Sequence, residues 1–126
     1  MEKILLVEDE VEVANIITKF LLRAGFSVDV VYDLAQGMAK SPLDYTVVLL
    51  DIMLGGKKSF CLLEKVKKEN PDIIVIMVSG HDTGEYITEA KRLGADGFLP
   101  KPFRMEYLEK FLLSKIKSLR RQADRE

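Results

Sequence analysis

Six apolar residues follow one another at Ile73-Ile74-Val75-Ile76-Met77-Val78, and the hydroxyl of Ser79 comes directly after them. A continuous apolar run of this length is typical of a strand that is covered on both faces, as in a parallel sheet. Asn70-Pro71 ends the helical pattern that precedes the run. The run therefore predicts a buried strand of a parallel sheet, with a polar residue at its carboxyl end.

Segments of strand length and segments of helical period alternate along the rest of the chain. We predict further strands at 4–7, 27–31, 46–50 and 97–99. Apolar residues at three- and four-residue steps predict helices near 13–24, 34–39, 60–69, 85–93 and 108–119. Asp33 with Gln36 forms a capping box for the second helix, and Asp82 or Thr83 caps the fourth. The Gly55-Gly56-Lys57-Lys58 stretch is expected to be a loose loop.

This alternation predicts an α/β fold with the strand–helix unit repeated five times. Each parallel crossover is long and right-handed, so the units give a doubly wound, three-layer domain with helices on both faces of a five-stranded parallel sheet. The expected strand order is 2-1-3-4-5, the flavodoxin-like order. In such sheets ligands bind beyond the carboxyl ends of the strands, and functional residues are therefore expected there.

Length and composition narrow the class of protein. The 126 residues fit one domain, and 48% apolar with 31% charged residues is an ordinary globular balance. With 19 basic and 20 acidic residues, the chain has no strong field for nucleic acid or a membrane surface. No apolar run is long enough to span a bilayer, no signal peptide is recognisable, and the cytoplasm is the expected compartment. The one cysteine, Cys61, excludes an internal disulfide and is expected to be a small buried thiol.

Polar side chains stand at four of the predicted strand ends. Glu8-Asp9 follows the first strand, Asp51 the third, Ser79 the fourth and Lys101 the fifth. Each has an ordinary explanation when taken alone: an acid in the first turn of a helix, a capping hydroxyl or a solvated lysine. Their common placement at one edge of the sheet argues for a site.

The chemistry of this set is consistent with phosphoryl transfer. Three carboxylates without histidine or cysteine suit a hard cation such as Mg²⁺, which prefers to share its site with phosphate oxygens. A carboxylate is an established covalent acceptor of phosphoryl groups. Lys101 supplies a positive charge for the transferred group, and Ser79 supplies a hydrogen-bond donor.

With these residues in place, the chain resembles the receiver domain of bacterial response regulators, the CheY-like superfamily of two-component signalling. The likeness runs from Lys3 to about Leu119. It rests on four motifs: Ile4-Leu5-Leu6-Val7-Glu8-Asp9-Glu10, residues 47–53 around Asp51, Val78-Ser79-Gly80, and Gly94-Ala95-Asp96-Gly97-Phe98-Leu99-Pro100-Lys101-Pro102-Phe103. The receiver domain is accordingly expected at 1–119, with 120–126 as a charged tail or the start of a linker to an output domain.

The resemblance implies roles for the site residues. Asp51 would accept a phosphoryl group from a sensor histidine kinase or a phosphotransfer domain, in a reaction that depends on Mg²⁺, with Mn²⁺ as an alternative ion. The side chains of Glu8, Asp9 and Asp51 and the backbone carbonyl of Met53 would bind the metal. Lys101 would contact the phosphoryl group. The chain would not be an enzyme beyond self-phosphorylation and autodephosphorylation.

The resemblance also implies a two-state switch. Ser79 would move to hydrogen-bond the phosphoryl group, and the ring of Phe98 would turn inward. The Lys101-Pro102 peptide bond would be cis. The face made by the fourth helix, the fifth strand and the last helix would then control an output domain or a downstream protein. A homodimer formed on phosphorylation is a further expectation, whereas direct binding to nucleic acid or a membrane is not expected.

Some positions depart from the family pattern, and rival functions remain. Glu8 stands where aspartate is common; Gly55 replaces a frequent proline and Ser59 a frequent glycine, which leaves the conformation of the 51–59 loop open. Met53 and His81 hold the positions that tune loss of the phosphoryl group in this family. A hydrolase of the aspartyl-phosphate type would need an acid at 53, and a flavin carrier a neutral loop at 8–10. A constitutive binding module without phosphorylation is the third rival, against which the retained site residues argue.

Overall fold

The structure is a computed structural model that describes residues 2–80 and 84–125. His81 and the predicted caps Asp82 and Thr83 lie outside the described residues. Five parallel strands form the main sheet in the order β2-β1-β3-β6-β7. They are β1 Lys3–Val7, β2 Ser27–Val31, β3 Val47–Asp51, β6 Ile74–Ser79 and β7 Gly97–Pro100. The predicted fold and strand order are confirmed, since β6 and β7 are the fourth and fifth strands of this sheet along the chain.

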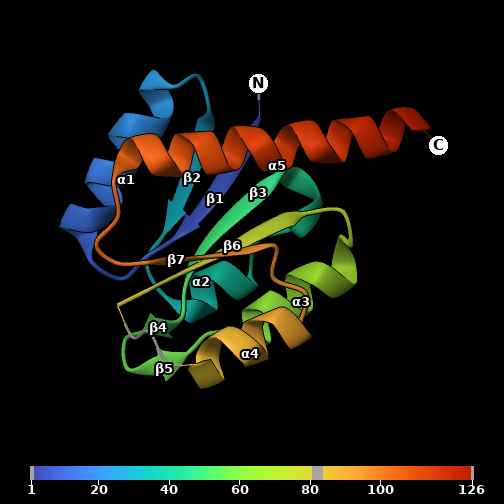
Figure 1. Cartoon of the computed structure of the whole chain (residues 1–126). Coiled ribbons are helices and arrows are strands. Elements are labelled where there is room, and N and C mark those ends of the chain that lie inside the picture. Colours follow the sequence, from blue (N-terminus) through green and yellow to red (C-terminus); the bar gives the residue numbers. More distant parts are fainter. Residues whose placement is uncertain (1, 81–83, 126) are drawn as a thin grey trace.

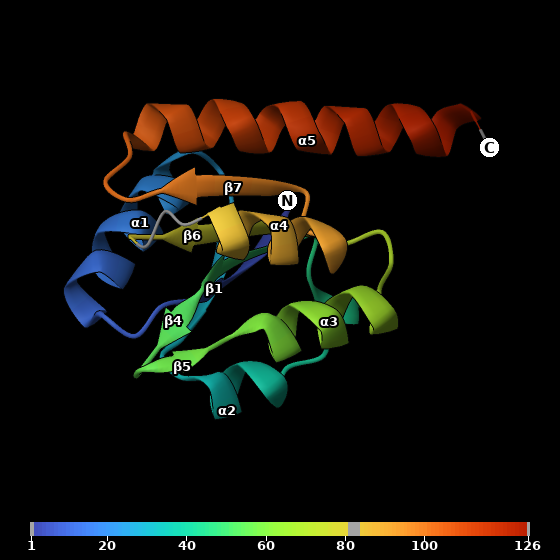
Figure 2. The ribbon, with the colours of Figure 1, turned by 60° about the horizontal axis from the view of Figure 1, so that its bottom comes forward.

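Helices cover both faces of the sheet, which gives three layers (Figures 1 and 2). One face carries α1 (Val11–Arg23) and α5 (Met105–Arg125). The opposite face carries α2 (Leu34–Met38), α3 (Phe60–Glu69) and α4 (Gly84–Arg92). A 3-10 turn at Pro42–Asp44 leads into β3.

Side chains alternate between the two layers and fill two apolar clusters. Ile4, Leu6 and Leu49 point to the cluster beneath α1 and α5, whereas Leu5 and Leu50 point to the one beneath α3 and α4. Every residue of β3 and β6 is buried, which explains why these strands read as continuous apolar runs. The sheet is therefore a rigid platform whose strand ends are fixed in position.

Local signals place the ends of the elements. Asp33 caps α2, because its carboxylate accepts a hydrogen bond from the Gln36 backbone N–H at 2.7 Å. The Gln36 side chain in turn accepts from the Tyr32 backbone N–H at 2.8 Å, one residue earlier than a capping box requires. The predicted cap is therefore confirmed, with its return bond shifted by one residue.

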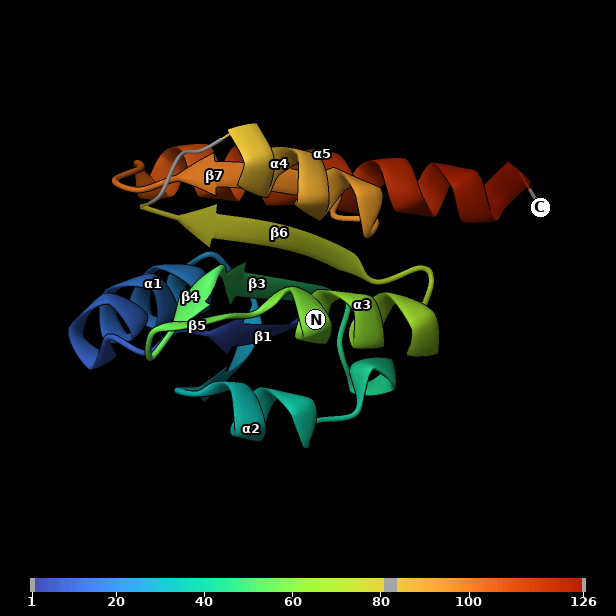
Figure 3. The same cartoon turned by 90° about the horizontal axis from the view of Figure 1, so that it is seen from below.

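The stretch after Asp51 differs from the loose loop that the sequence predicts. Met53–Leu54 (β4) pairs antiparallel with Lys57–Lys58 (β5). Gly55 and Gly56 join them with φ values of 56° and 79°. Two successive residues of positive φ are the signature of a type I′ hairpin turn, which glycine adopts without strain. This hairpin lies beyond the carboxyl ends of the main strands (Figure 3).

Two further features depart from expectation on the helices. Cys61 is exposed rather than buried, because Leu62, Leu63 and Val66 form the face of α3 that packs on the sheet. The helix α5 continues to Arg125, past the residue at which the sequence pattern ends. It packs closely on β7: a Cβ placed on Gly97 would lie 2.3 Å from Cζ of Phe111.

Within the described residues, none of the helices has both the length and the apolar content that a membrane crossing demands.

Candidate functional site

The carboxyl edge of the sheet gathers the polar residues that the sequence analysis singles out. Asp51 ends β3 opposite Val78, and Ser79 ends β6 opposite Pro100. Glu8 directly follows β1, whose last residue pairs with Leu50. Because the parallel strands hold these residues in one register, their side chains lie at the same level of the sheet.

Lys101 connects the two buried carboxylates of the site. Its ammonium lies 2.5 Å from Oε1 of Glu8 and 3.0 Å from Oδ2 of Asp51. Glu8 is 2% exposed and Asp51 8% exposed, so both charges are largely removed from water. The Lys101 backbone N–H also donates to the Ser79 carbonyl at 2.8 Å, which fixes the chain that carries the ammonium. One side chain after β1, one at the end of β3 and one after β7 therefore meet at a single point.

The electrostatics of this point are unbalanced. Burial raises the pKa of Glu8 above its usual range, although the Lys101 ammonium beside it acts in the opposite direction. Desolvation lowers the pKa of Lys101, but hydrogen bonds to Glu8 and Asp51 outweigh it, so this pKa stays above its usual value. Two buried carboxylates thus share one ammonium, and the site keeps an excess of negative charge.

Backbone N–H groups of the hairpin hold the carboxylates of Asp9 and Asp51. The Gly55 N–H donates to Oδ2 of Asp9 at 3.0 Å, and the Met53 N–H donates to Oδ1 of Asp51 at 3.3 Å. Asp9 itself is exposed. Through these two backbone N–H groups the hairpin closes one side of the acidic pocket formed by Glu8, Asp9 and Asp51.

The donor set suits a hard divalent cation. Carboxylate oxygens of Glu8, Asp9 and Glu10 lie within 4.8 Å of one another, the one such group of three among the described residues. Asp51 is not in this group, but its carboxylate contacts the Lys101 ammonium, which also contacts Glu8. Oxygen ligands with excess negative charge are what Mg²⁺ requires, and the three members of this described group are all carboxylates.

The two proposed switch residues occupy different places. Ser79 is fully buried at the end of β6. Phe98 is half-buried and packs with the apolar cluster beneath α3 and α4. Its ring lines a cavity of about 70 Å³ between α4 and β7 that Ile87 and Ala90 also line. The Lys101-Pro102 peptide bond is cis, as the resemblance implies.

Sequence reasoning did not assign two residues that the structure places at the pocket. Glu10 belongs to the carboxylate group, and its N–H donates to Glu8 at 3.2 Å. The hydroxyl of Ser59 donates to the backbone carbonyl of Asp51 at 2.6 Å. The Glu8-Asp9-Glu10 run was a signal for the first. For the second, the replacement of a family glycine by serine was the available signal.

Comparison with known proteins agrees with this geometry. The chain matches the family model of the response regulator receiver domain over residues 4–113, and it belongs to that family. It is 32% identical over 121 residues to the transcriptional activator protein IrlR of Burkholderia pseudomallei, an alignment that covers 95% of this chain and 51% of IrlR. The chain thus spans about half the length of this relative.

Solved structures show the same architecture. A CheY-like response regulator receiver domain protein from Methanospirillum hungatei JF-1 superposes with a TM-score of 0.92 at 26% identity, over 97% of this chain and 98% of that one. The receiver domain of NtrX from Brucella abortus gives a TM-score of 0.81 at 31% identity, over 90% and 98% of the two chains. The flavodoxin-like fold is therefore shared with this family.

Family membership sets the general role of the chain. Receiver domains take part in two-component signalling, in which phosphorylation carries the signal from a kinase to an output domain. They are signalling domains rather than enzymes in the usual sense, and they bind Mg²⁺ at an acidic cluster. In this chain the carboxylates of Glu8, Asp9 and Glu10 form an acidic group that follows β1.

Proposed function

We propose that Asp51 is the phosphoacceptor of this receiver domain. The observation that supports this assignment is the contact of Lys101 with both Asp51 and Glu8 at the carboxyl edge of the sheet. A carboxylate Oδ of Asp51 attacks the phosphorus of the donor, the bond from phosphorus to the donor nitrogen breaks, and a phosphorus–oxygen bond forms. For a phosphohistidine donor the leaving imidazole nitrogen then takes up a proton. Hydrolysis later breaks the acyl phosphate, releases inorganic phosphate and restores the carboxylate.

The residues around Asp51 have separate tasks in this proposal. Mg²⁺, or Mn²⁺ in its place, would be held by the side chains of Glu8, Asp9 and Asp51 and by the carbonyl of Met53. When bound, the ion neutralises charge on the transferred oxygens. Lys101 lies beside Asp51 and contacts a phosphoryl oxygen once the group has arrived.

The phosphodonor is a sensor histidine kinase or a phosphotransfer domain. An apolar groove of about 420 Å³ opens beside Lys101 between α1 and the start of α5. Val13, Ile16, Phe103 and Met105 are among the residues that line it. A donor that brings its phosphoryl group to Asp51 must cover the adjoining surface, and this groove offers it apolar area to bury.

The output follows from movement of Ser79 and Phe98. Ser79 hydrogen-bonds the phosphoryl group, Phe98 turns inward, and the face formed by α4, β7 and α5 changes shape. That face controls an output domain or a downstream protein, or forms a homodimer on phosphorylation. Ala90 is the one described residue of α4 that is fully buried, so this helix is lightly anchored. The proposal includes a cytoplasmic location and a receiver domain at 1–119, with 120–126 as a tail or linker.

Intact-mass measurement with acetyl phosphate and Mg²⁺ tests the assignment. The wild-type chain is expected to gain the mass of one phosphoryl group, and Asp51→Asn to gain none. Asp44→Asn is the matched control, because Asp44 is an exposed aspartate in the turn before β3. Equal labelling of wild type and Asp51→Asn would contradict the proposal. Loss of label when Mg²⁺ is chelated is the expected dependence on the ion.

A further inference from the structure

The segment between Asp51 and α3 is closed at its base by Ser59. Its backbone N–H donates to the Ile52 carbonyl at 2.8 Å, and its hydroxyl donates to the Asp51 carbonyl at 2.6 Å. Ser59 is fully buried, so water does not compete for the hydroxyl. These two bonds bring the start of α3 against the end of β3 and turn the intervening residues into a closed loop.

The hydroxyl of Ser59 is not used in the way its position suggests. Ser59 is the N-cap residue of α3, where a serine oxygen ordinarily accepts a hydrogen bond from an N–H of the first helical turn. The structure gives Ser59 no such capping bond. A serine cap stabilises a helix by satisfying one of its first N–H groups, and α3 lacks that contribution here. The side chain is instead directed to the residue proposed to receive the phosphoryl group.

The closed loop is attached to the pocket at three points. Ser59 holds the Asp51 carbonyl at the base of the hairpin. The Met53 N–H contacts the Asp51 carboxylate, and the Gly55 N–H contacts Asp9 at the tip. Met53 lies inside the closed loop, two residues after Asp51 and six before Ser59. If the base of the loop opened, the Met53 backbone would no longer be held in place beside the Asp51 carboxylate.

We propose that Ser59 is a positioning residue for the phosphoacceptor. Its hydroxyl fixes the backbone of Asp51 and keeps the hairpin closed, so that the carboxylate and the Met53 backbone stay in the arrangement that the reaction uses. The inference rests on the proposed function of Asp51. A net hydrogen-bond contribution of about 0.5–1.5 kcal/mol corresponds to about a twofold to tenfold lower rate of phosphorylation on its loss.

The experiment compares Ser59→Ala and Ser59→Cys with wild type in the full chain. Alanine removes the hydroxyl without adding volume, and cysteine keeps a weaker donor of similar size. The matched control is Thr46→Val, which removes a hydroxyl that donates to Glu2 at 2.7 Å, at the opposite edge of the sheet. The rate of labelling by acetyl phosphate is measured at saturating Mg²⁺, and amide hydrogen exchange is followed by NMR at Met53 and Gly55.

Labelling is expected to be fastest in wild type, slower in Ser59→Cys and slowest in Ser59→Ala. All three chains should finally carry one phosphoryl group. Amide hydrogen exchange at Met53 and Gly55 is expected to be slowest in wild type, faster in Ser59→Cys and fastest in Ser59→Ala. Thr46→Val should lose stability but keep both the wild-type rate and the wild-type exchange at these amides. Should Ser59→Ala be unfolded at the assay temperature, the rate and exchange of Ser59→Cys decide the question.

Two results separate this inference from the one on which it rests. A wild-type chain that labels on Asp51, with Ser59 variants that label at the same rate, would overturn the positioning role alone. So would a Thr46→Val variant slowed as much as Ser59→Ala, because the effect would then follow stability and not position. A wild-type chain without label would overturn the phosphoacceptor assignment and this inference together.

Discussion

The two edges of the sheet both carry ion pairs, but in opposite surroundings. At the amino edge Arg120 pairs with Glu2 and Lys3 pairs with Asp29, each cation with its own carboxylate. At the carboxyl edge Lys101 forms salt bridges with both Glu8 and Asp51. The Arg120 side chain is 68% exposed, whereas that of Lys101 is 21% exposed and that of Glu8 only 2%. The amino edge is thus balanced and hydrated, while the carboxyl edge is buried and short of positive charge.

The comparison separates structural charge from functional charge. Exposed pairs contribute little to stability because water and salt screen them. Buried carboxylates without sufficient counter-charge cost free energy, and such groups are concentrated at functional sites, where a bound cation can supply the missing charge. The imbalance at the carboxyl edge, and not the number of charges there, is therefore what indicates a site.

Replacing Lys101 at the carboxyl edge and Arg120 at the amino edge should give the largest difference in the free energy of unfolding. In the absence of divalent ions, Lys101→Met is expected to lower the free energy of unfolding by about 2 kcal/mol or more, because it leaves two buried carboxylates unpaired. Arg120→Met should lower it by less than about 1 kcal/mol. Urea unfolding measures both. Similar losses in the two variants would remove the distinction between the edges.

Magnesium should act at one edge only. At ten times its dissociation constant a ligand stabilises the folded state by about 1.4 kcal/mol, which thermal unfolding detects as a higher melting temperature. Asp9→Asn is expected to weaken or abolish the Mg²⁺ effect. The control Asp72→Asn, which changes an exposed aspartate near the amino edge, should leave it intact. A wild-type chain that does not respond to Mg²⁺ would contradict the acidic pocket as the binding site.

The two edges should also respond to pH in opposite directions when Mg²⁺ is chelated. Burial raises the pKa of Glu8 from its ordinary value of 4.5, so the folded state holds this proton more tightly and stability falls as pH rises above 4.5. The hydrogen bond from Thr46 lowers the pKa of Glu2, so its contribution is present above 4.5 and is lost as pH falls below it. The free energy of unfolding, measured from acid to neutral pH, should therefore fall less steeply above pH 4.5 in Glu8→Gln than in wild type. In Glu2→Gln it should fall less steeply below pH 4.5. Equal slopes in both variants would count against these assignments.

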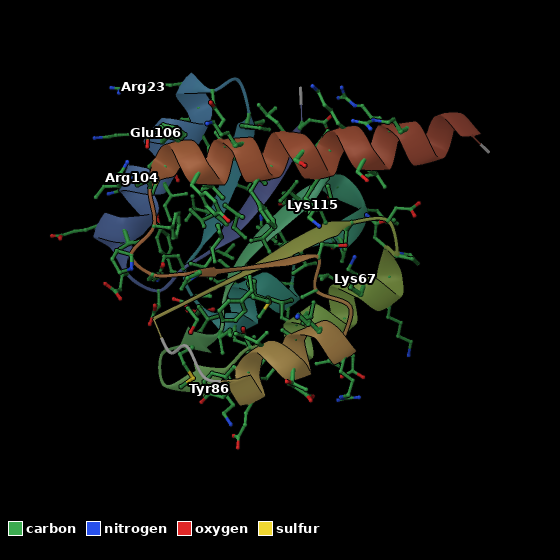
Figure 4. All side chains as sticks on the ribbon, in the orientation of Figure 1. Arg23, Lys67, Tyr86, Arg104, Glu106 and Lys115 are labelled. Carbon is green, nitrogen blue, oxygen red and sulfur yellow. The ribbon has the colours of Figure 1, made fainter. Side chains whose placement is uncertain are left out.

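The smallest expected effect concerns a lysine–tyrosine contact at each edge. Lys3 lies 5.3 Å from the ring of Tyr45, and Lys58 of the hairpin lies 5.2 Å from the ring of Tyr86. Tyr86 belongs to α4 (Figure 4). An exposed contact of this kind contributes about 0.5–1 kcal/mol. Lys58→Met is expected to lose about that much stability and to speed amide exchange in the first turn of α4. Lys57→Met, one residue away, should match wild type in both measurements.

The fold was predictable because its strongest signals are local. Buried runs such as 47–50 and 73–78 identify strands, and their alternation with amphipathic segments fixes a parallel sheet. The site followed from the same rule, since parallel strands bring their carboxyl ends together. Lys101 meets Glu8 and Asp51 across 93 and 50 residues of sequence, as the strand-end argument requires.

Three features could not be predicted, namely the turn at 55–56, the exposure of Cys61 and the partner of the Ser59 hydroxyl. In each case the local sequence allows more than one conformation. Gly55-Gly56 is compatible with a loose loop or a type I′ turn, and the pairing of the flanking residues decides between them. The exposure of Cys61 depends on which side of α3 faces the sheet, and one helical step separates it from buried Leu62. Ser59 at a helix start suggests a cap, and only tertiary structure directs its hydroxyl to Asp51.

The close approach of α5 to β7 links two positions that are fourteen residues apart in sequence. Any side chain at residue 97 would meet the ring of Phe111, whose Cζ would lie 2.3 Å from the added Cβ. The two positions therefore act as one unit of sequence variation. A larger residue at 97 therefore requires that the Phe111 ring shift or be replaced by a smaller side chain, so substitutions at 97 are expected to depend on the residue at 111.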